Sequence, residues 1–350
     1  MKVTLPVRRA ILARQTYEAP AEGRRGKIRL DFNENTTGCS AAALSAIRRL
    51  NAKEIATYPE YENSTRELAR YFRVKPDELL LTNGGDDALR VFFDTFVEPG
   101  TNILICEPTF PMYRYYAEIA GARVETLRYG LQMEFPVAAA LAALRKKPRV
   151  FFLANPNNPT GTLVSNRQIE QLLRAATNTV VVVDEAYAEF SGTNAIALTR
   201  KYPHIFIART FSKAAGLAAL RLGAVVANAD SLALVRRAMP PYPVNMAALV
   251  AAAAAARERK SIESYVVGTK RRREWFAEQL RKQGVRVFPT AANFLLADFG
   301  ERGQVFFRKL ARHNILVRER SKDLGPGFVR VTVGTQAELE RFLRLLKQKD

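Results

Sequence analysis

The stretch VVVVDEAY, residues 180–187, places two acidic residues directly behind four consecutive valines. An uninterrupted β-branched run of this kind is typical of a strand that is covered on both faces, as strands are in a parallel sheet. Burying Asp184 at the end of such a strand would be costly unless its carboxylate met a cation. The stretch therefore predicts an α/β protein with a functional carboxylate at one edge of its sheet.

Strand patterns alternate with helical patterns on both sides of this stretch. Strands joined through helices predict right-handed crossovers and a mainly parallel sheet flanked by helices. The expected strands are residues 78–82, 102–106, 149–154, 180–183 and 204–209, and the expected helices are residues 64–72, 86–96, 136–144 and 168–176.

A proline-rich break, PPYP at residues 240–243, marks a change in the pattern. The remainder predicts a smaller α+β domain with helices at 261–283 and 336–347 and strands at 285–288, 293–297 and 328–333. We expect an N-terminal arm that joins the small domain (residues 1–45), a large domain (residues 46–243) and a C-terminal small domain (residues 244–350).

The chain of 350 residues carries a formal net charge of +20. Its basic clusters, among them Arg24-Arg25, Arg236-Arg237 and residues 271–273, are scattered and lack interleaved aromatic residues. We interpret them as solvated helix faces that attract anionic ligands, and expect no nucleic-acid partner. No run approaches the roughly 18 apolar residues of a membrane span, so no membrane partner is expected either.

The two cysteines, Cys39 and Cys106, are far apart in the sequence, which argues against a disulfide framework or a zinc site. The N-terminus shows no apolar core followed by a cleavage site, so we expect no secretory signal and a cytoplasmic location. His204 and His313 have no acidic or cysteine partner at metal-ligand spacing, and no metal is expected.

Four candidate motifs follow predicted strands, where ligands bind in open α/β sheets. The turn TNGGDD (82–87) lets the backbone approach an anion at a helix N-terminus, although a plain strand-to-helix turn looks the same. NPNNPTG (155–161) is either a tight turn or a rigidly presented amide. Asp184 suits a protonated pyridine nitrogen, and Lys213 in RTFSK (209–213) suits Schiff-base chemistry.

The order and spacing of these motifs resemble the fold-type I pyridoxal-phosphate-dependent aminotransferases, and most closely their histidinol-phosphate branch. The resemblance covers nearly the whole chain. It includes LDFNEN (30–35), TYPE (57–60), EPTFPMY (107–113), NPTG (158–161), DEAY (184–187), TFSKA (210–214) and VRVTVG (329–334).

The resemblance implies a fold-type I transferase that uses pyridoxal 5′-phosphate. Lys213 would hold the cofactor as a Schiff base and shuttle a proton, and Asp184 would keep the pyridine nitrogen protonated. Asn158 and Tyr187 would hydrogen-bond the phenolic oxygen of the cofactor, and Tyr113 would stack on its ring.

The remaining implied roles concern the phosphate and the substrate. Tyr58 would reach the cofactor from the partner subunit of a homodimer with shared active sites. Tyr17, Asn158 and Arg330 would contact the substrate, Arg330 by clamping its carboxylate. The cofactor phosphate would be bound by Gly85, Asp86, Thr210, Ser212 and Arg221.

The function implied is transfer of an amino group from L-histidinol phosphate to 2-oxoglutarate, which yields imidazole-acetol phosphate and L-glutamate. An aromatic amino-acid aminotransferase or a threonine-phosphate decarboxylase on the same scaffold stays open. Thr36-Thr37, Asp87 and residues 18–27 differ from the pattern of the family that the sequence resembles, and these differences leave the identity of the substrate open. A transcription regulator with an aminotransferase-like domain would need a DNA-binding module, and no winged helix fits before Asp31.

Overall fold

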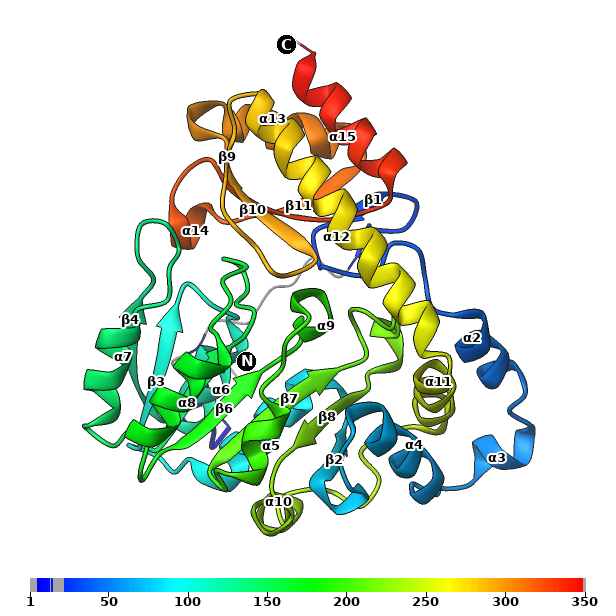
Figure 1. Cartoon of the computed structure of the whole chain (residues 1–350), viewed down its shortest axis with the longest axis vertical. Helices are drawn as coiled ribbons and strands as arrows, with labels where there is room; N and C mark the ends of the chain where they lie inside the picture. The colour runs from blue at the N-terminus through cyan, green and yellow to red at the C-terminus, as the bar shows by residue number, and fades with distance from the viewer. Residues whose placement is uncertain (1–4, 13, 15–21, 349–350) are drawn as a thin grey trace.

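Seven strands form the larger sheet of the computed structural model, which describes residues 5–12, 14 and 22–348 (Figure 1). Within these residues β8 alone runs opposite to the other six strands, so its pairs with β7 and β2 are antiparallel. The mainly parallel α/β fold is therefore confirmed. In sheet order the strands are β2 (Leu79–Thr82), β8 (Gly223–Val226), β7 (Ile205–Thr210), β6 (Val180–Asp184), β5 (Val150–Ala154), β3 (Asn102–Glu107) and β4 (Arg123–Arg128).

Helices cover both faces of this sheet (Figure 1). Several begin where the sequence supplies a cap: Ser165 and Gln168 form a reciprocal capping box at the start of α8. The helices are α1 (Arg9–Leu12), α2 (Ala41–Arg48), α3 (Ala52–Ala56), α4 (Glu62–Phe72), α5 (Gly84–Phe96), α6 (Met112–Ala120), α7 (Val137–Leu144), α8 (Asn166–Ala175), α9 (Ala188–Ser191), α10 (Ala229–Arg236) and α11 (Met246–Arg257), with short 3₁₀ turns at Pro76–Glu78, Ile196–Arg200 and Ala218–Leu220.

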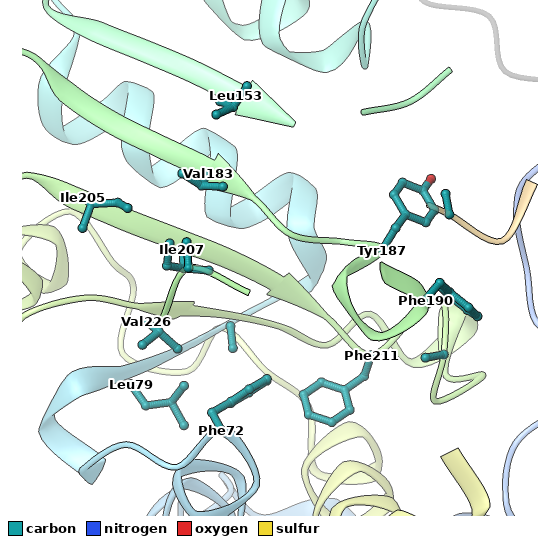
Figure 2. Packing of buried hydrophobic residues seen from close by; sticks show 14 of the residues in the cluster. Phe72, Leu79, Leu153, Val183, Tyr187, Phe190, Ile205, Ile207, Phe211 and Val226 are labelled. Atoms are coloured by element: carbon teal, nitrogen blue, oxygen red, sulfur yellow. The ribbon is translucent and has the colours of Figure 1, made fainter. Parts of the chain in front are cut away.

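The core of the larger sheet lies on both of its faces because side chains along a strand alternate in direction. Val181 and Val183 of β6 pack on one face beside Phe72 and Phe211 (Figure 2). Val182, between them, packs on the opposite face in a separate cluster. The central strands are thus covered on both sides, as the run of valines predicts.

The smaller sheet has five strands in the order β1-β11-β12-β10-β9. β1, from the N-terminal part of the chain, pairs parallel with β11, and the other pairs are antiparallel. Its elements are β1 (Ile28–Leu30), β9 (Arg286–Val287), β10 (Phe294–Asp298), β11 (Ile315–Glu319), β12 (Phe328–Thr332), α12 (Arg259–Lys282), α13 (Gly303–Arg312), α14 (Ser321–Leu324) and α15 (Gln336–Lys347), with a 3₁₀ turn at Gly300–Arg302.

The two sheets lie in separate halves of the molecule, and the long helix α12 runs from one half to the other (Figure 1). α11 packs against α2 and α4 in the half that holds the larger sheet. We therefore propose that the larger domain continues through α11, beyond the limit at residue 243 that the sequence suggests. No helix in the described part of the chain has the length and apolar character to cross a membrane.

Candidate active site

A cavity of about 550 Å³ lies between the carboxyl ends of the larger sheet's strands and the edge of the smaller sheet. Ligands bind at this position in open α/β sheets, because loops diverge there and leave a crevice. The cavity brings together eleven of the thirteen site residues expected from the sequence: Gly85, Asp86, Tyr113, Asn158, Asp184, Tyr187, Thr210, Ser212, Lys213, Arg221 and Arg330.

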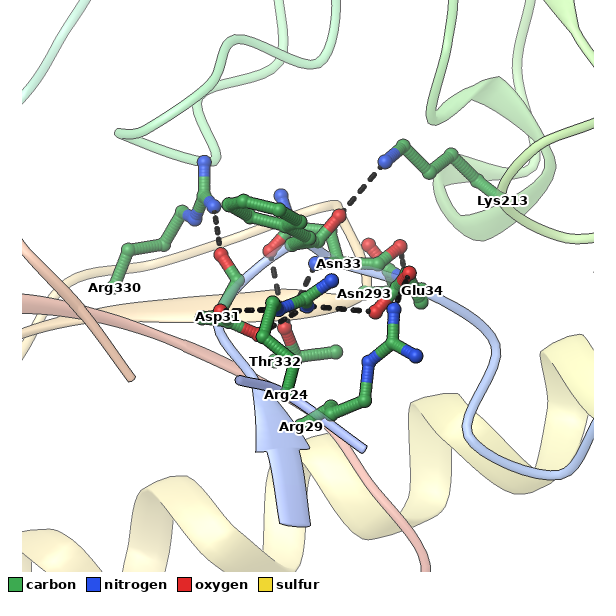
Figure 3. A network of polar contacts seen from close by, with 10 residues as sticks. Arg24, Arg29, Asp31, Asn33, Glu34, Lys213, Asn293, Arg330 and Thr332 are labelled. Atoms are coloured by element: carbon green, nitrogen blue, oxygen red, sulfur yellow. Dashed lines mark hydrogen bonds and ion pairs between the residues drawn. The ribbon is translucent and has the colours of Figure 1, made fainter. Parts of the chain in front are cut away.

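Lys213 presents its amine to this cavity just beyond β7. Its Nζ donates a hydrogen bond of 2.8 Å to the carbonyl oxygen of Phe32 (Figure 3). The same atom lies 6.0 Å from the centre of the Tyr187 ring. Burial is the largest cause that lowers the pKa of the amine, to about 8, and the Arg330 guanidinium adds to the effect. The structure thus holds a lysine whose neutral, nucleophilic form is far more populated near neutral pH than that of an ordinary lysine.

Asp184 ends β6 at the inner wall of the cavity. Its Oδ2 accepts a 2.7 Å hydrogen bond from the Tyr113 hydroxyl, and its Oδ1 accepts one of 3.1 Å from the backbone N–H of Ala186. Burial raises the pKa of the carboxyl, and no cation among the described residues forms an ion pair with it. The carboxylate is therefore prepared to meet a cationic ligand group.

The first turn of α5 and the loop after β7 form one end of the cavity. Gly84 opens α5 at φ +82°, and the first turn of a helix leaves backbone N–H groups without acceptors inside the helix. Arg221 lies over this turn and donates to Asp86 at 3.0 Å. The Thr210 hydroxyl donates to Ser212 Oγ at 3.0 Å. Free N–H groups, hydroxyls and a guanidinium together suit a phosphate.

Arg330 of β12 reaches across the cavity from the smaller sheet. Its guanidinium donates to Asn158 Oδ1 and to the carbonyl oxygen of Asp31, while its Nε is buried without a partner. Burial is the largest cause that lowers the pKa of Arg330, to about 10. The Tyr187 hydroxyl accepts a 2.9 Å hydrogen bond from Asn33 Nδ2. Arg330 is thus bonded directly to Asn158, and both Arg330 and Tyr187 are bonded to residues of the segment 31–33.

Four further arginines line the cavity and were given no site role from the sequence: Arg29, Arg209, Arg318 and Arg320. Arg209 forms ion pairs with Glu185 and Glu189. Arg29 donates to Glu34 and Arg320 to Asp323, whereas Arg318 has no carboxylate partner among the described residues. Arg318 stands directly opposite Arg330 in the register of β11 and β12. Only the pairing of these strands, which the sequence does not display, brings the two arginines together.

Phe110 and Tyr113 both line the cavity, and they differ in exposure. Tyr113 is fully buried, and its ring stacks on Phe152 with 5.4 Å between centroids. Phe110 lines the cavity, is partly exposed and meets the edge of Tyr113 at 5.9 Å. We propose that Phe110 stacks on the bound ring, while Tyr113 acts through its hydroxyl on Asp184.

Among the described residues, one expected site residue, Tyr58, does not line the cavity. Tyr58 is 78% exposed and stacks on Tyr242, with 4.4 Å between ring centroids. Tyr17 lies outside the described residues. Tyr58 is therefore open to contact from outside this chain.

Arg24 differs from the expectation that the basic clusters are solvated helix faces. It lies outside any helix, is 8% exposed and forms ion pairs with Asp31 and Glu34. Its neighbour Arg25 is exposed. For Arg24 the interpretation as a surface charge was wrong, because two carboxylates nearby in the sequence compensate its burial.

The residues of the cavity fit pyridoxal phosphate at three points. Asp184 is a buried carboxylate in need of a cation, which the protonated ring nitrogen would supply. The turn that opens α5, with Arg221, would hold the phosphate. Lys213 would hold the aldehyde carbon. One ligand with a cationic ring, a phosphate and an aldehyde meets all three demands.

The fold and this site define a class of pyridoxal-phosphate enzyme, and the comparison with known families agrees. The profile of the family described as "Aminotransferase class I and II" matches residues 25–346. The chain belongs to this family.

Within the family, the chain is similar to histidinol-phosphate aminotransferases. It is 35% identical to the one from Geobacillus sp. (strain WCH70) over 328 residues, which cover 92% of this chain and 89% of the relative. It is 36% identical to the one from Symbiobacterium thermophilum over 326 residues, covering 91% and 90%. A crystal structure of the Sinorhizobium meliloti enzyme with pyridoxal-5′-phosphate shares the fold, with a TM-score of 0.90, 24% identity and coverage of 99% and 97%.

Proposed function

We propose that this chain is a pyridoxal-phosphate-dependent aminotransferase that transfers the amino group of L-histidinol phosphate to 2-oxoglutarate. The observation that carries the substrate is the pair Arg318 and Arg330, which face each other across β11 and β12 and line the cavity. Neither forms an ion pair with a carboxylate in the described part of the chain. Two guanidinium groups without counter-charge favour a strongly anionic substrate end.

Each proposed substrate brings an anion to that end of the cavity. Histidinol phosphate carries a phosphate and no carboxylate, whereas glutamate and 2-oxoglutarate carry carboxylates. The planar fork of a guanidinium matches both groups, so one arginine pair can serve both half-reactions. The curated relatives named histidinol-phosphate aminotransferases support this choice of donor.

When bound, pyridoxal phosphate supplies an electron-withdrawing ring that stabilises negative charge on the substrate carbon next to nitrogen. Lys213 Nζ would take the proton from that carbon and return it to the cofactor side. Asp184 keeps the positive charge of the ring nitrogen in place, and the Tyr113 hydroxyl orients Asp184. Asn158 and Tyr187, which line the cavity, would hydrogen-bond the ring oxygen.

The assembly we propose is a homodimer in which Tyr58 of each subunit completes the site of the other. The exposed stack of Tyr58 on Tyr242 supports this, because a solvent-exposed aromatic pair is typical of an interface. We also propose a cytoplasmic location, which the two free cysteines, Cys39 and Cys106, support.

A comparison of amino donors tests the substrate. We expect kcat/KM for histidinol phosphate to exceed that for phenylalanine by at least about tenfold, or roughly 1.4 kcal/mol of transition-state binding. Arg330→Lys should weaken both half-reactions mainly through KM, because a lysine cannot bind an anion with two parallel hydrogen bonds. Arg312→Lys, an exposed change on α13, is the matched control. Equal use of phenylalanine would point to an aromatic aminotransferase, and release of carbon dioxide from threonine phosphate to a decarboxylase.

A further inference from the structure

The segment 31–34, directly after β1, contacts three groups of the proposed active site. The carbonyl oxygen of Phe32 accepts the 2.8 Å hydrogen bond from Lys213, and that of Asp31 accepts one from Arg330 (Figure 3). The side chain of Asn33 donates to the Tyr187 hydroxyl at 2.9 Å. The segment therefore accepts hydrogen bonds from Lys213 and Arg330 and donates one to Tyr187.

Asn33 anchors this segment to the smaller sheet. Its backbone adopts φ 55°, in the left-handed region, so the carbonyl groups on either side of it point in different directions. Its N–H donates to Thr332 Oγ1 at 2.9 Å, and its carbonyl oxygen accepts from Asn293 Nδ2 at 3.0 Å. These bonds fix one side of the segment and leave the carboxylates of Asp31 and Glu34 to be held from the other side.

Arg24 holds that other side. Its Nε and Nη2 donate to the two oxygens of Asp31 at 3.2 Å and 2.7 Å, and Nη2 also donates to Glu34 at 3.0 Å. The guanidinium lies 4.0 Å from the centre of the Phe32 ring, which lines the cavity. All the side-chain contacts described for Arg24 are to this one segment (Figure 3).

We propose that Arg24 is a positioning residue that keeps the carbonyl oxygen of Phe32 in place as the resting acceptor of the Lys213 amine whenever that amine is not joined to the cofactor. A lysine side chain has a flexible four-carbon stem, so a free amine needs a defined acceptor to return to the same place in each cycle. A carbonyl oxygen fits this task, because it accepts from a neutral amine as well as from an ammonium.

Glu34 connects Arg24 to a second arginine that lines the cavity. It accepts from Arg24 with one oxygen and from Arg29 with the other, and Arg29 lines the cavity. Arg24 thus acts on Lys213 through Phe32 and on Arg330 through the carbonyl of Asp31. The catalytic part of this inference rests on the proposed function of Lys213, but the resting contact itself can be tested without substrate.

The test compares Arg24→Gln with Arg25→Gln, which removes the same charge from the exposed neighbour. In the apo-protein, reductive methylation with formaldehyde is followed at the Lys213 peptide by mass spectrometry between about pH 6 and pH 10, so that the rate constant of the neutral amine is separated from its pKa. We expect Arg24→Gln to raise that rate constant about fivefold, the factor that one net hydrogen bond is worth. Arg25→Gln should leave it unchanged.

Kinetics of the cofactor-loaded enzyme supply the second readout. Arg24→Gln should lower kcat by about tenfold to 100-fold, which is the effect of a misplaced catalytic group. It should also raise KM for the keto-acid substrate, because the Asp31 carbonyl that orients Arg330 is no longer held in place. Arg24→Lys keeps the charge without the fork and should recover part of both. If Arg24→Gln does not fold, Arg24→Lys against Arg25→Lys decides with the same two readouts.

Unchanged methylation and unchanged kcat in the Arg24 variants would overturn the proposal, even if the melting temperature fell, because they would leave Arg24 with a structural role alone. Failure of the proposed function looks different. It would appear as transamination by Lys213→Ala, whereas the methylation of Lys213 in the apo-protein would still report on Arg24.

Discussion

Lys213 owes its expected reactivity to its surroundings. Burial and the Arg330 guanidinium lower the pKa of its amine to about 8, while Glu34 and Asp86 oppose the shift. At pH 7 about one amine in ten is then neutral, against about one in 3,000 for an ordinary lysine. Since only the neutral amine attacks an aldehyde, the cavity prepares this one side chain for cofactor capture.

Capture of pyridoxal phosphate by the apo-protein should therefore depend on pH in a defined way. We expect the rate to rise about tenfold per pH unit below pH 8 and to level off above it, because the neutral amine increases and then saturates. The yellow absorbance that borohydride abolishes measures capture. Lys213→Ala should show none. A rate that is flat between pH 6 and pH 8, or capture by Lys213→Ala, would contradict the assignment.

Asp184 offers a second prediction at this scale. Asp184→Asn should lower turnover by about 100-fold or more, because the amide cannot stabilise a positive ring nitrogen, while cofactor affinity should fall much less. Asp94→Asn, an exposed change on α5, serves as the control. Single-turnover kinetics and equilibrium dialysis separate the two effects. A variant that loses the cofactor yet turns over normally when saturated would assign Asp184 to binding alone.

At the scale of elements, most strands were predictable from their apolar runs, whereas β1, β4, β8 and β11 were missed. The buried strands β5, β6 and β7 lie where the sequence predicts them. β4 was missed because it mixes charged and apolar residues, and none of its residues is buried. β11 was missed because two of its five residues, Arg318 and Glu319, are charged. β8 is fully buried, but it has only four residues and begins with a glycine. Pattern reasoning detects longer apolar runs and is weak for short strands and for strands that mix charged and apolar residues.

The residues of the candidate site also divide into those that the sequence predicts and those that it does not. Residues in motifs next to strands, such as Lys213 and Asp184, were predictable, because the chemistry of their neighbours marks them. Arg318 and Phe32 were not, because their roles depend on contacts between segments far apart in the chain. Phe32 takes part through its backbone oxygen, which no residue type reveals.

The turn between β2 and α5 allows a prediction for one element. A Cβ added at Gly84 would lie 2.6 Å from Arg221 Nη2, at a backbone φ of +82°. We expect Gly84→Ala to displace Arg221 and weaken pyridoxal phosphate binding by about tenfold, beyond a backbone cost of about 1 kcal/mol in stability. Gly100→Ala is the matched control, since Gly100 has φ +81° and no atom within 4 Å of the added Cβ. Equal cofactor affinity in both variants would show that Arg221 adapts.

At the scale of the whole molecule, some of the arginines behind the net charge of +20 form hydrogen bonds within the fold. Arg236 donates to the carbonyl oxygen of Leu79, and Arg273 donates to that of Ala292. These guanidinium groups satisfy backbone acceptors at the ends of secondary structure, as lysine or arginine side chains often do. A basic composition in this chain therefore does not imply a nucleic-acid surface.

Sharing of active sites between subunits can be tested by mixing two defective variants. Lys213→Ala keeps Tyr58, and Tyr58→Ala keeps Lys213, so a hybrid dimer contains one intact site. After subunit exchange at equal concentrations we expect about a quarter of wild-type activity from statistical pairing, well above either variant alone. Leu131→Ala, an exposed loop change, mixed with Lys213→Ala controls for simple dilution. Sedimentation of a fully active monomer would rule the shared site out.

The cavity is walled by two sheets, with Lys213 and Asp184 supplied by one half of the molecule and Arg330 by the other. A substrate whose amino end meets Lys213 while its anion meets Arg330 spans the seam between these halves. Binding of such a substrate therefore stabilises the packing of the two halves against each other, by a free energy that grows with the logarithm of the substrate concentration. The concentration of substrate in the cell thus sets how strongly the two halves are held together.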